Sequence, residues 1–336
     1  MSFVQTRVKF IILLFIYFLF NSCSPTDNNY YVINKVRVVG VLFQNSALVS
    51  GSSLVGTATQ QFPVRLTSSA SSCTNTHFYL ATISPTAEIP TLTINSIVLY
   101  GIGNNYLSSG GGARGVSAGM TGTSIASTFF FTSATPVTTT VQTSPYRLTV
   151  FDFTVNCANL TTTNLNSYMN QVSDIPGFQL SYTVNSSASS DKGFYSFYFL
   201  PEPTDTWWTT ASFPTAVSSD KISQIKNGLA VTNNPILINS LTPTSNSTVS
   251  GGNDVNITVN LSSPSVPSPR DPNNPLFANK TRVQWYVTNG SINLDTASST
   301  TWNPGVGSGN TIGGIVVVRD LLGGVDLKIL GPLTTQ

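Results

Sequence analysis

The sequence has little charge and almost no histidine. Its 336 residues include 15 Lys or Arg, 13 Asp or Glu and one His, so only 8% are charged. Nucleic-acid binding needs clustered Lys and Arg, and transition-metal sites need three or four close His, Cys or carboxylate ligands. We therefore expect no nucleic-acid partner, no metal centre and no cofactor.

The sequence also lacks an apolar run long enough to cross a bilayer, which takes roughly 20 helical residues. The longest run, Phe10 to Phe20, has eleven residues and follows the basic residues Arg7 and Lys9. This arrangement is typical of a secretory signal peptide. We predict that residues 1–22 are removed, which leaves 15 − 2 = 13 basic and 13 acidic residues. The exported chain then has no net charge.

A cysteine stands directly after this segment. Asn21 and Ser22 precede Cys23, and the polar stretch Ser24 to Asn29 follows it. This resembles the signal of a bacterial lipoprotein of the spirochaete type. The resemblance implies that Cys23 is lipidated, that residues 23–29 form a tether and that the protein is anchored in the outer membrane, facing the cell surface. Two or three acyl chains make such an anchor effectively permanent. The alternative is an ordinary cleaved signal that leaves a Cys23 thiol.

The two remaining cysteines, Cys73 and Cys157, form an even pair in an oxidising compartment. A disulfide between them would close a loop of 157 − 73 = 84 residues. In the chain-entropy model such a loop contributes about 4 kcal/mol to stability. We predict this disulfide, with two reduced, buried cysteines as the alternative.

The exported chain is expected to be all-β. Short runs rich in β-branched and aromatic residues alternate with Gly, Pro, Ser and Asn, as strands do between turns. The expected strands of the first part are Lys35 to Leu42, Phe62 to Leu66, His77 to Ile83, Ile94 to Tyr100, Thr128 to Phe131, Tyr146 to Val155 and Phe178 to Val184. Since no strand and helix alternation appears, the pattern predicts β-sandwiches.

Two short helices are expected within this part. Leu165 to Val172 carries an apolar stripe at helical spacing. A second helix is expected to begin at Ser219 and to stop at Gly228. It would close a first, elaborated sandwich domain over residues 30–230, and the next residues would be a linker.

A second sandwich domain is expected over residues 236–333. Alternating apolar residues predict strands over Val255 to Leu261 and Val283 to Val287, and a hairpin turn at Asn289-Gly290. A further hairpin is expected over Ile315 to Leu330. The strand with a central Trp285, the string TTWNP and the closing VVVRDLLGGVDL resemble bacterial Ig-like and PKD-like domains.

An internal echo relates the two expected domains. Val49 to Gly51 recurs at Val249 to Gly251, a shift of 200 residues, and Val38 falls on Ile238 at the same shift. The echo suggests that an Ig-like sandwich also begins near Lys35.

Enzyme-like motifs are present but lack their context. Gly115 to Gly119 fits G-x-S-x-G around Ser117, yet Gly and Ser flank it and the one histidine, His77, lies upstream. A nucleophile elbow needs a strand before the serine, a helix after it and a histidine further on. We therefore predict no catalytic residues. A calcium site at a loop end, with Asp254, Asp320 or Asp326, stays open as an alternative.

An aromatic segment, Gly193 to Trp208, is the candidate for ligand binding. Tyr195 and Phe197 are expected on one face of a strand and Phe194 on the other, before a polar loop that ends in Trp207-Trp208. A paired Trp can stack on sugar rings or fill a partner's pocket, and packing in the core is the alternative.

The function expected from these features is that of a noncatalytic adhesion or ligand-binding module. Its partners would be a host or envelope protein or a glycan, besides the membrane. A second loop cluster, residues 262–275 with 320–324, could also contribute to binding. The alternative function is a structural subunit of an envelope assembly.

Overall fold

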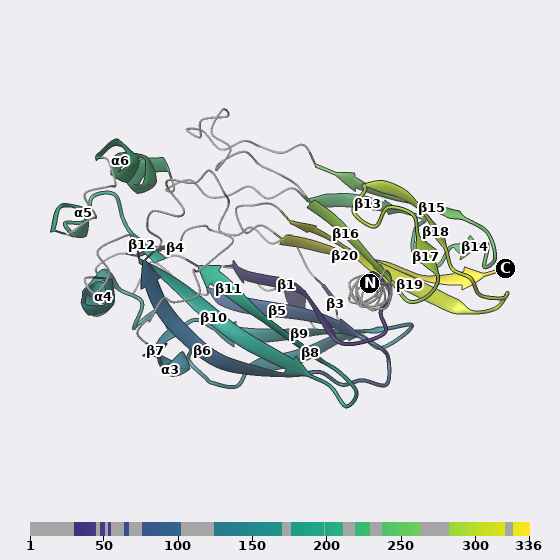
Figure 1. Ribbon diagram of the computed structural model, residues 1–336, viewed down its shortest axis with the longest axis horizontal. Coiled ribbons are helices and arrows are strands. Elements are labelled where there is room, and N and C mark those ends of the chain that lie inside the picture. The colour runs from purple at the N-terminus through teal and green to yellow at the C-terminus, as the bar shows by residue number, and fades with distance from the viewer. Residues whose placement is uncertain are drawn as a thin grey trace, which may run out of the picture. The chain divides into compact units, whose positions relative to one another are not determined.

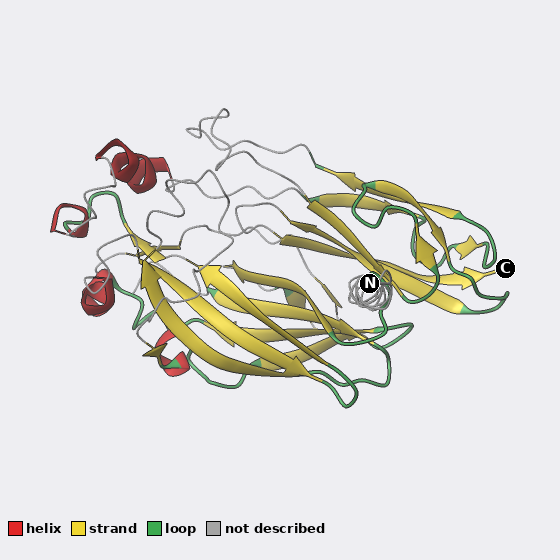
Figure 2. Cartoon of the chain, viewed as in Figure 1, coloured by secondary structure: helices red, strands yellow, loops and turns green. Residues whose placement is uncertain are grey.

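The computed structural model describes residues 30–44, 48–50, 53–54, 64–66, 76–101, 124–169, 176–197, 199–210, 219–228, 237–262, 282–319 and 325–336. These residues form mainly β-strands in several sheets, with a few short helices (Figures 1 and 2). The all-β fold with two sandwiches is thereby confirmed. Cys23, Cys73, Ser117, Asp320 and most of the 262–275 loop lie outside the described residues.

The first sandwich, called the N-terminal sandwich, consists of two four-stranded sheets. Their strand orders are β1-β5-β9-β8 and β11-β10-β6-β7. The strands are β1 (Arg37–Gln44), β5 (His77–Ser84), β6 (Thr91–Gly101), β7 (Ser124–Ile125), β8 (Val137–Gln142), β9 (Arg147–Thr154), β10 (Pro176–Asn185) and β11 (Ser190–Phe197). Two small sheets accompany them: β2 (Val49–Ser50) with β3 (Ser53–Leu54), and β4 (Val64–Leu66) with β12 (Phe199–Pro201).

The second sandwich, called the C-terminal sandwich, has the sheet orders β13-β15-β18-β17 and β14-β20-β19-β16. Its strands are β13 (Ile238–Thr242), β14 (Thr248–Val249), β15 (Val255–Leu261), β16 (Arg282–Val287), β17 (Ser291–Ile292), β18 (Ser299–Asn303), β19 (Thr311–Arg319) and β20 (Val325–Thr335). The expected strands over Val255 to Leu261 and Val283 to Val287 are both present.

The strand order identifies the C-terminal sandwich as Ig-like. In constant-type Ig domains, strands A, B, E and D form one sheet and strands C, F and G the other. In chain order, β13, β15, β16, β17, β18, β19 and β20 then correspond to strands A to G. With these letters the two sheets have the orders A-B-E-D and G-F-C. The short strand β14 lies parallel to the last strand, β20. Trp285 on β16 is fully buried, as expected for a tryptophan on strand C. The N-terminal sandwich gives the same order when β1 is taken as A and β11 as G.

Four short helices accompany the strands in the described part of the chain. They are α3 (Ser127–Phe130), α4 (Thr162–Met169), α5 (Trp207–Thr210) and α6 (Ser219–Gly228). The two expected helices correspond to α4 and α6. The expected strand over Thr128 to Phe131 was wrong: α3 is a single helical turn that places Phe130 and Phe131 in the core, so tertiary packing overrides their β propensity. Of the helices described, none has the length and apolar character needed to cross a membrane.

The predicted hairpin at Asn289-Gly290 was also wrong. Gly290 has a positive φ of 82°, as the predicted turn requires, but β16 pairs with β19 and β17 pairs with β18. The chain therefore crosses here from one sheet of the sandwich to the other. A side chain at Gly290 would collide with the Asn303 carbonyl, and Trp302 Nε1 donates to the Asn289 carbonyl at 2.7 Å. The tight turn thus serves the packing of a core tryptophan.

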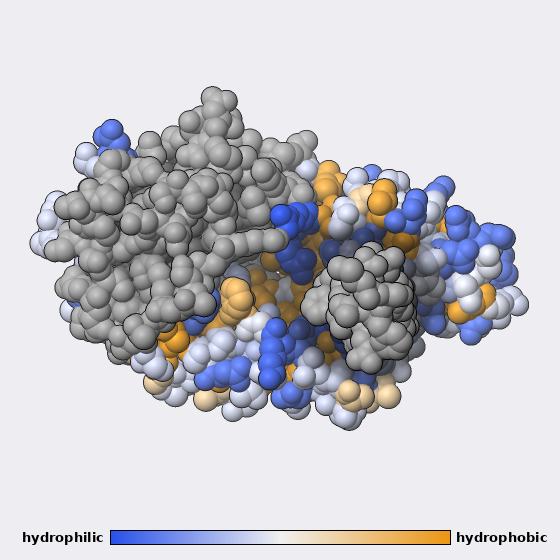
Figure 3. Space-filling model, in the orientation of Figure 1, coloured by the Kyte–Doolittle hydropathy of each residue, from blue (hydrophilic) through white to orange (hydrophobic). Residues whose placement is uncertain are grey.

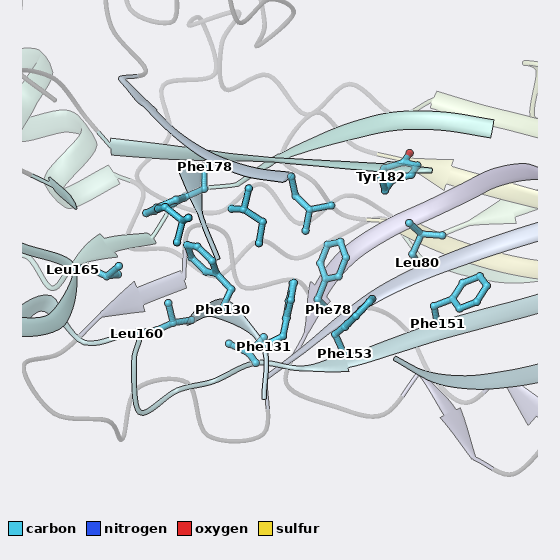
Figure 4. Packing of buried hydrophobic residues seen from close by; sticks show 14 of the residues in the cluster. Phe78, Leu80, Phe130, Phe131, Phe151, Phe153, Leu160, Leu165, Phe178 and Tyr182 are labelled. Carbon is cyan, nitrogen blue, oxygen red and sulfur yellow. The ribbon is translucent and has the colours of Figure 1, made fainter. Parts of the chain in front are cut away.

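Phenylalanines dominate the core of the N-terminal sandwich (Figure 4). Phe131 contacts both Phe78 and Phe153, with ring centroids 5.5 and 4.9 Å away, and Phe130 meets Phe178 edge to face at 4.9 Å. Such offset and edge contacts are the favoured aromatic geometries. The core of the C-terminal sandwich is built instead around Trp285 and Trp302, both fully buried.

A third hydrophobic cluster, called the shared core, joins the two sandwiches. Residues 31–336 form one compact unit, and this cluster packs β5 and β9 of one sandwich against β19 and β20 of the other. Its members are Ile33, Val39, Leu48, Tyr79, Ala81, Ile83, Tyr146, Leu148, Val150, Ile315, Val317, Val325 and Leu327. Consequently β19 is buried on both faces: Val316 and Val318 belong to the core of their own sandwich, and Val317 to the shared core.

Polar contacts reinforce the shared core. The Tyr146 hydroxyl donates to the buried Gly314 carbonyl at 2.6 Å, and the Arg319 guanidinium donates to the Val39 carbonyl. Burial raises the pKa of Tyr146 far above its ordinary value, so this hydroxyl keeps its proton. Val287 also exchanges backbone hydrogen bonds with Tyr31 and Ile33, both 2.8 Å long. The predicted domain boundaries at 30–230 and 236–333 stay a prediction.

Candidate functional site

The Trp207-Trp208 pair is buried, not exposed on a loop. Trp207 and Trp208 are 3% and 6% exposed, form the helical turn α5 and belong to the core of the N-terminal sandwich. Their rings meet edge to face at 4.9 Å, and Trp208 Nε1 donates to the Glu202 carbonyl at 3.0 Å. Neither indole offers a free face to a sugar or a partner. Core packing, the alternative reading of these two residues, fits this placement.

Of the predicted disulfide, only Cys157 is described. It follows β9, is half-buried and packs against the phenylalanine core. His77 pairs with Thr154 in the ladder between β5 and β9, so the chain before β5 and the chain after β9 leave the sheet at the same end. The link to Cys73 stays a prediction.

The one histidine forms a polar pair with an aspartate. His77 Nδ1 lies 2.8 Å from Asp152 Oδ1, and the His77 ring stacks on Tyr79 at 5.5 Å. Burial raises the pKa of Asp152, and the hydrogen bond with His77 partly offsets this. No serine or cysteine of the described residues is hydrogen-bonded to this pair, so we assign it no nucleophilic chemistry.

The aspartates considered for calcium are used otherwise where they are described. Asp326 is buried and accepts hydrogen bonds from the backbone N–H groups of Ile238 and Leu327, at 2.6 and 2.8 Å. Asp254 accepts one from the Asn303 side chain at 3.2 Å. Across the described ranges, no three His, Cys, Asp or Glu side chains are grouped to hold a metal ion.

The candidate binding surface is the outer face of β6, β10 and β11, called the hydroxyl face. On β10, Phe178, Leu180 and Tyr182 point into the core, so the alternating residues Gln179, Ser181 and Thr183 point outward. In register beside Ser181 lie Phe194 of β11 and Ser96 of β6, which makes a row across three strands. Lys192 and Thr93 flank Thr183 in the next row.

A β-bulge adds an amide to this face. The pairing of β6 with β10 shifts between Ser181 and Tyr182, where Ser96 and Ile94 are their partners, so Asn95 is the extra residue. Ile94 and Ile97 both pack into the core, and therefore Asn95 and Ser96 both face outward. Bulges commonly re-aim a side chain in this way next to functional sites.

Hydrogen bonds hold the polar groups of the hydroxyl face in place. Asn95 Nδ2 donates to Thr183 Oγ1 at 2.9 Å, and the Ser96 and Ser181 hydroxyls lie 2.7 Å apart. Each hydroxyl and amide still has spare donor or acceptor capacity, because a hydroxyl has one donor and two acceptor sites. The side chains are therefore preorganised for a ligand that both donates and accepts.

Phe194 is the apolar element of the hydroxyl face. Its side chain is 62% exposed, although it stands in the middle of a strand. Among the residues that the structure describes, the other large hydrophobic side chains with similar exposure are Ile89, Val137 and Leu294, and they lie in other segments. An exposed ring bordered by fixed hydroxyls combines an apolar contact with directional hydrogen bonds, which is how small-ligand sites obtain specificity.

Alternation in the sequence already pointed to Phe194. The period-two reading places Tyr195 and Phe194 on opposite faces of one strand, and in the structure Tyr195 packs against the core while Phe194 is exposed. The polar residues beside Phe194 could not be found in this way. They lie on other strands, and the register between strands that are far apart in the sequence cannot be derived from a local pattern. The bulge at Asn95 leaves no local sign either.

Comparisons with known proteins found distant likenesses among solved structures. No family model matches the sequence, and no curated protein does. Among solved structures, fibronectin(III)-like modules of Clostridium thermocellum CbhA share 10% identity and a TM-score of 0.23, over 90% of this chain and 94% of that chain. Titin domains z1z2 in complex with telethonin share 8% identity and a TM-score of 0.19, over 91% and 98%. Zebrafish RET cadherin-like domains 1 to 4 share 11% and 0.20, over 91% and 52%.

These likenesses are too distant to carry a function to this chain. The class of the protein follows from its own strand order: it is an all-β protein built from Ig-like β-sandwiches. The fold alone does not identify a ligand, so a proposal for the function must rest on the surface described above.

Proposed function

We propose that the protein is a noncatalytic, lipid-anchored module of the cell envelope that binds a neutral glycan through the hydroxyl face. The observation that carries the proposal is Phe194, an exposed ring with Ser181 and Ser96 beside it in one row. A sugar ring presents an apolar C–H face and a rim of hydroxyls. The ring of Phe194 suits the first and the fixed hydroxyls suit the second.

The charge of the face favours a neutral ligand. On the described surface of the three strands, Lys192 is the one charged side chain directed outward, because Asp191 turns to the sandwich edge and accepts from the Val38 N–H at 2.8 Å. A strongly charged polymer would need complementary clusters of charge. A neutral, hydroxyl-rich chain needs none.

The test is a glycan array probed with the full-length protein and two variants. Phe194→Ala removes the ring, and Ile89→Ala is the matched control because Ile89 is equally exposed, at 66%, but lies off the face. We expect neutral oligosaccharides to bind the wild type and Ile89→Ala, and Phe194→Ala to bind about tenfold or more weakly, as for an interface hot spot. Equal binding by Phe194→Ala would refute the assignment.

The anchor is tested separately. Mass spectrometry of the mature N-terminus should find an acylated Cys23, and protease should digest the protein on intact cells. Protection until lysis would move the protein to the periplasm. An unmodified Cys23 would replace the anchor by an ordinary cleaved signal.

A second function, a structural subunit that spaces or docks other envelope proteins, is favoured by the shared core. Tyr146, Ile315 and Val317 belong to one hydrophobic cluster that joins the two sandwiches, and such a joint suits a spacer. Co-purification of a stoichiometric membrane partner, in the absence of any glycan bound on the array, would favour this function over the first.

A further inference from the structure

The edges of the sheets differ in how they are protected. An uncovered edge strand presents N–H and C=O groups that pair readily with another strand, and proteins block it with charge, short length or covering segments. In the described residues, β7, β14 and β17 are edge strands of two residues each, too short to pair with much. The longer edge strands are β1, β8, β11, β13 and β16.

Side chains or backbone cover the long edges of the C-terminal sandwich. On β13, the Ile238 N–H donates to Asp326, and Lys328 donates to the Asn239 carbonyl at 2.9 Å. On β16, Val287 exchanges hydrogen bonds with Tyr31 and Ile33, so the chain itself supplies an extra strand segment.

One side of the N-terminal sandwich is protected in a similar way. Along β1, the Val36 and Val38 N–H groups donate to Ser189 Oγ and Asp191 Oδ2, both at 2.8 Å. On β11, Asp191 and the exposed Lys192 put charge on the strand. These two edges are therefore blocked.

The strand β8 has none of these protections. It is VTTTVQ, six residues without charge or proline, five of them β-branched. It pairs with β9 on one side, and no other described residue hydrogen-bonds to its outer edge. Val137 at its start is 67% exposed. The corresponding strand of the C-terminal sandwich, β17, has only two residues.

One other stretch, Thr91 to Ser96 of β6, is also uncovered by described residues, since β7 reaches only Ile97 and Val98. The bulge at Asn95 interrupts its ladder. On β8 the ladder is regular from Val137 to Thr140 and shifts only after it. Regular, β-branched and uncharged, β8 is the better template for an added strand.

We propose that β8 joins two copies of this chain, edge to edge and antiparallel, so that two four-stranded sheets become one sheet of 4 + 4 = 8 strands. A second copy fits because an uncharged strand meets its own copy without repulsion, and Thr opposite Thr is a favourable cross-strand pair. Pairing about a two-fold axis is the commonest symmetry of protein dimers.

The geometry of the pair is specific. In an antiparallel pair related by a two-fold axis normal to the sheet, one residue faces its own copy. Within the regular stretch Val137 to Thr140, that residue is Thr138 or Thr139, the two in the middle. A contact of so few residues buries less than the roughly 800 Å² per partner of a standard interface, so we expect a weak dimer.

Cysteine cross-linking in the full-length protein tests the proposal. Thr138→Cys and Thr139→Cys each place a thiol near the axis, and Thr334→Cys is the control, since Thr334 is exposed but pairs with strands on both sides. After oxidation, mass spectrometry identifies which peptides are joined. We expect one of the two β8 variants to be joined to its own copy at the introduced cysteine, and Thr334→Cys not to be.

Charge on the edge gives a second readout. Val137→Lys, added to the cross-linking variant, should abolish the cross-link because it puts a charge on the short pairing edge of each copy, which blocks the addition of a strand, while Thr334→Lys should leave it. Melting curves confirm that each variant is folded. No cross-link in either folded β8 variant, a cross-link unaffected by Val137→Lys, or a cross-link in cells to a different protein would each overturn the proposal.

Discussion

The two sandwiches share a strand order but differ in what they leave exposed. Both place the first strand beside the last through an aspartate: the Val38 N–H donates to Asp191 and the Ile238 N–H donates to Asp326. The two amides are 200 residues apart, which is the shift of the internal sequence echo. A common hydrogen bond at this spacing supports a common origin of the two halves.

The differences lie in the cores and the edges. The N-terminal sandwich packs around phenylalanines and keeps an exposed Phe194 and an uncovered β8, while the C-terminal sandwich packs around two tryptophans and has covered long edges. In the view of Figure 3, the described surface at the C-terminal end is mostly hydrophilic. On this difference we base the proposal that the N-terminal sandwich binds the ligand and the C-terminal one supports it.

The largest effect is expected from Trp285→Ala. The indole is fully buried, and Nε1 donates to the Ala297 carbonyl at 2.8 Å. Removing an aromatic side chain from a core costs about 3–5 kcal/mol. Denaturant unfolding measures this loss, with Leu294→Ala as the control because Leu294 is 59% exposed. A loss below about 1 kcal/mol would mean that the C-terminal sandwich is not built around this residue.

A smaller loss is expected from Tyr146→Phe. The change keeps the ring in the shared core but leaves the buried Gly314 carbonyl without the Tyr146 hydroxyl. An unsatisfied buried group costs about 1–3 kcal/mol. Because the bond joins the two sandwiches, the unfolding midpoint of the whole protein should fall. A stability equal to wild type would show that the contact is not formed in solution.

The aspartate clamp of the C-terminal sandwich, in which Asp326 accepts from the Ile238 N–H, should make the stability of the protein depend on pH. Burial raises the pKa of Asp326 above its ordinary value of 3.8, and its backbone donors and Lys328 only partly offset this. The folded state then binds the Asp326 proton more tightly than the unfolded state. This group therefore favours folding at low pH, and that contribution is lost as pH rises from about 3.8 through the raised pKa.

Urea unfolding across this pH range measures the effect. The difference in unfolding free energy between wild type and Asp326→Asn should change steadily in favour of the variant as pH rises. Leu294→Ala is the control because Leu294 is exposed and does not titrate. A difference for Asp326→Asn that is constant with pH would contradict the assignment.

The smallest effect on stability is expected from Phe194→Ala. An exposed side chain away from special features changes stability by no more than about 0.5 kcal/mol. The variant should melt with the wild type while it loses glycan binding. A large drop in its melting midpoint would show that Phe194 packs in the fold and would remove it from the binding surface.

Local patterns predicted most strands and the pairing of β19 with β20, but not the pairing of strands far apart in the chain. Alternation at Val255 to Leu261 and around Trp285 was sufficient for β15 and β16. The apolar run Ile315 to Val318 does not alternate, because it belongs to a strand that is buried on both faces. What covers its second face, Tyr79 and Tyr146 among others, lies more than 160 residues away in the chain. Contacts of that kind are not encoded in any local period.

The burial of large aromatic residues depends on more than their neighbours in the sequence. Trp207 and Trp208 follow a polar segment, so they were candidates for an exposed loop, yet the turn α5 carries them into the core. Phe194 is the reverse case, a large aromatic left outside. Alternation put Phe194 and Tyr195 on opposite faces of the strand, but which of these faces is buried depends on the tertiary environment.

Differential scanning calorimetry of the full-length protein tests the central claim, that the shared core makes the two sandwiches one body. We predict one transition whose calorimetric and van't Hoff enthalpies agree, and which shifts as a whole in Trp285→Ala and in Phe78→Ala, a change in the other core. Two transitions, with Trp285→Ala lowering one and leaving the other in place, would contradict it.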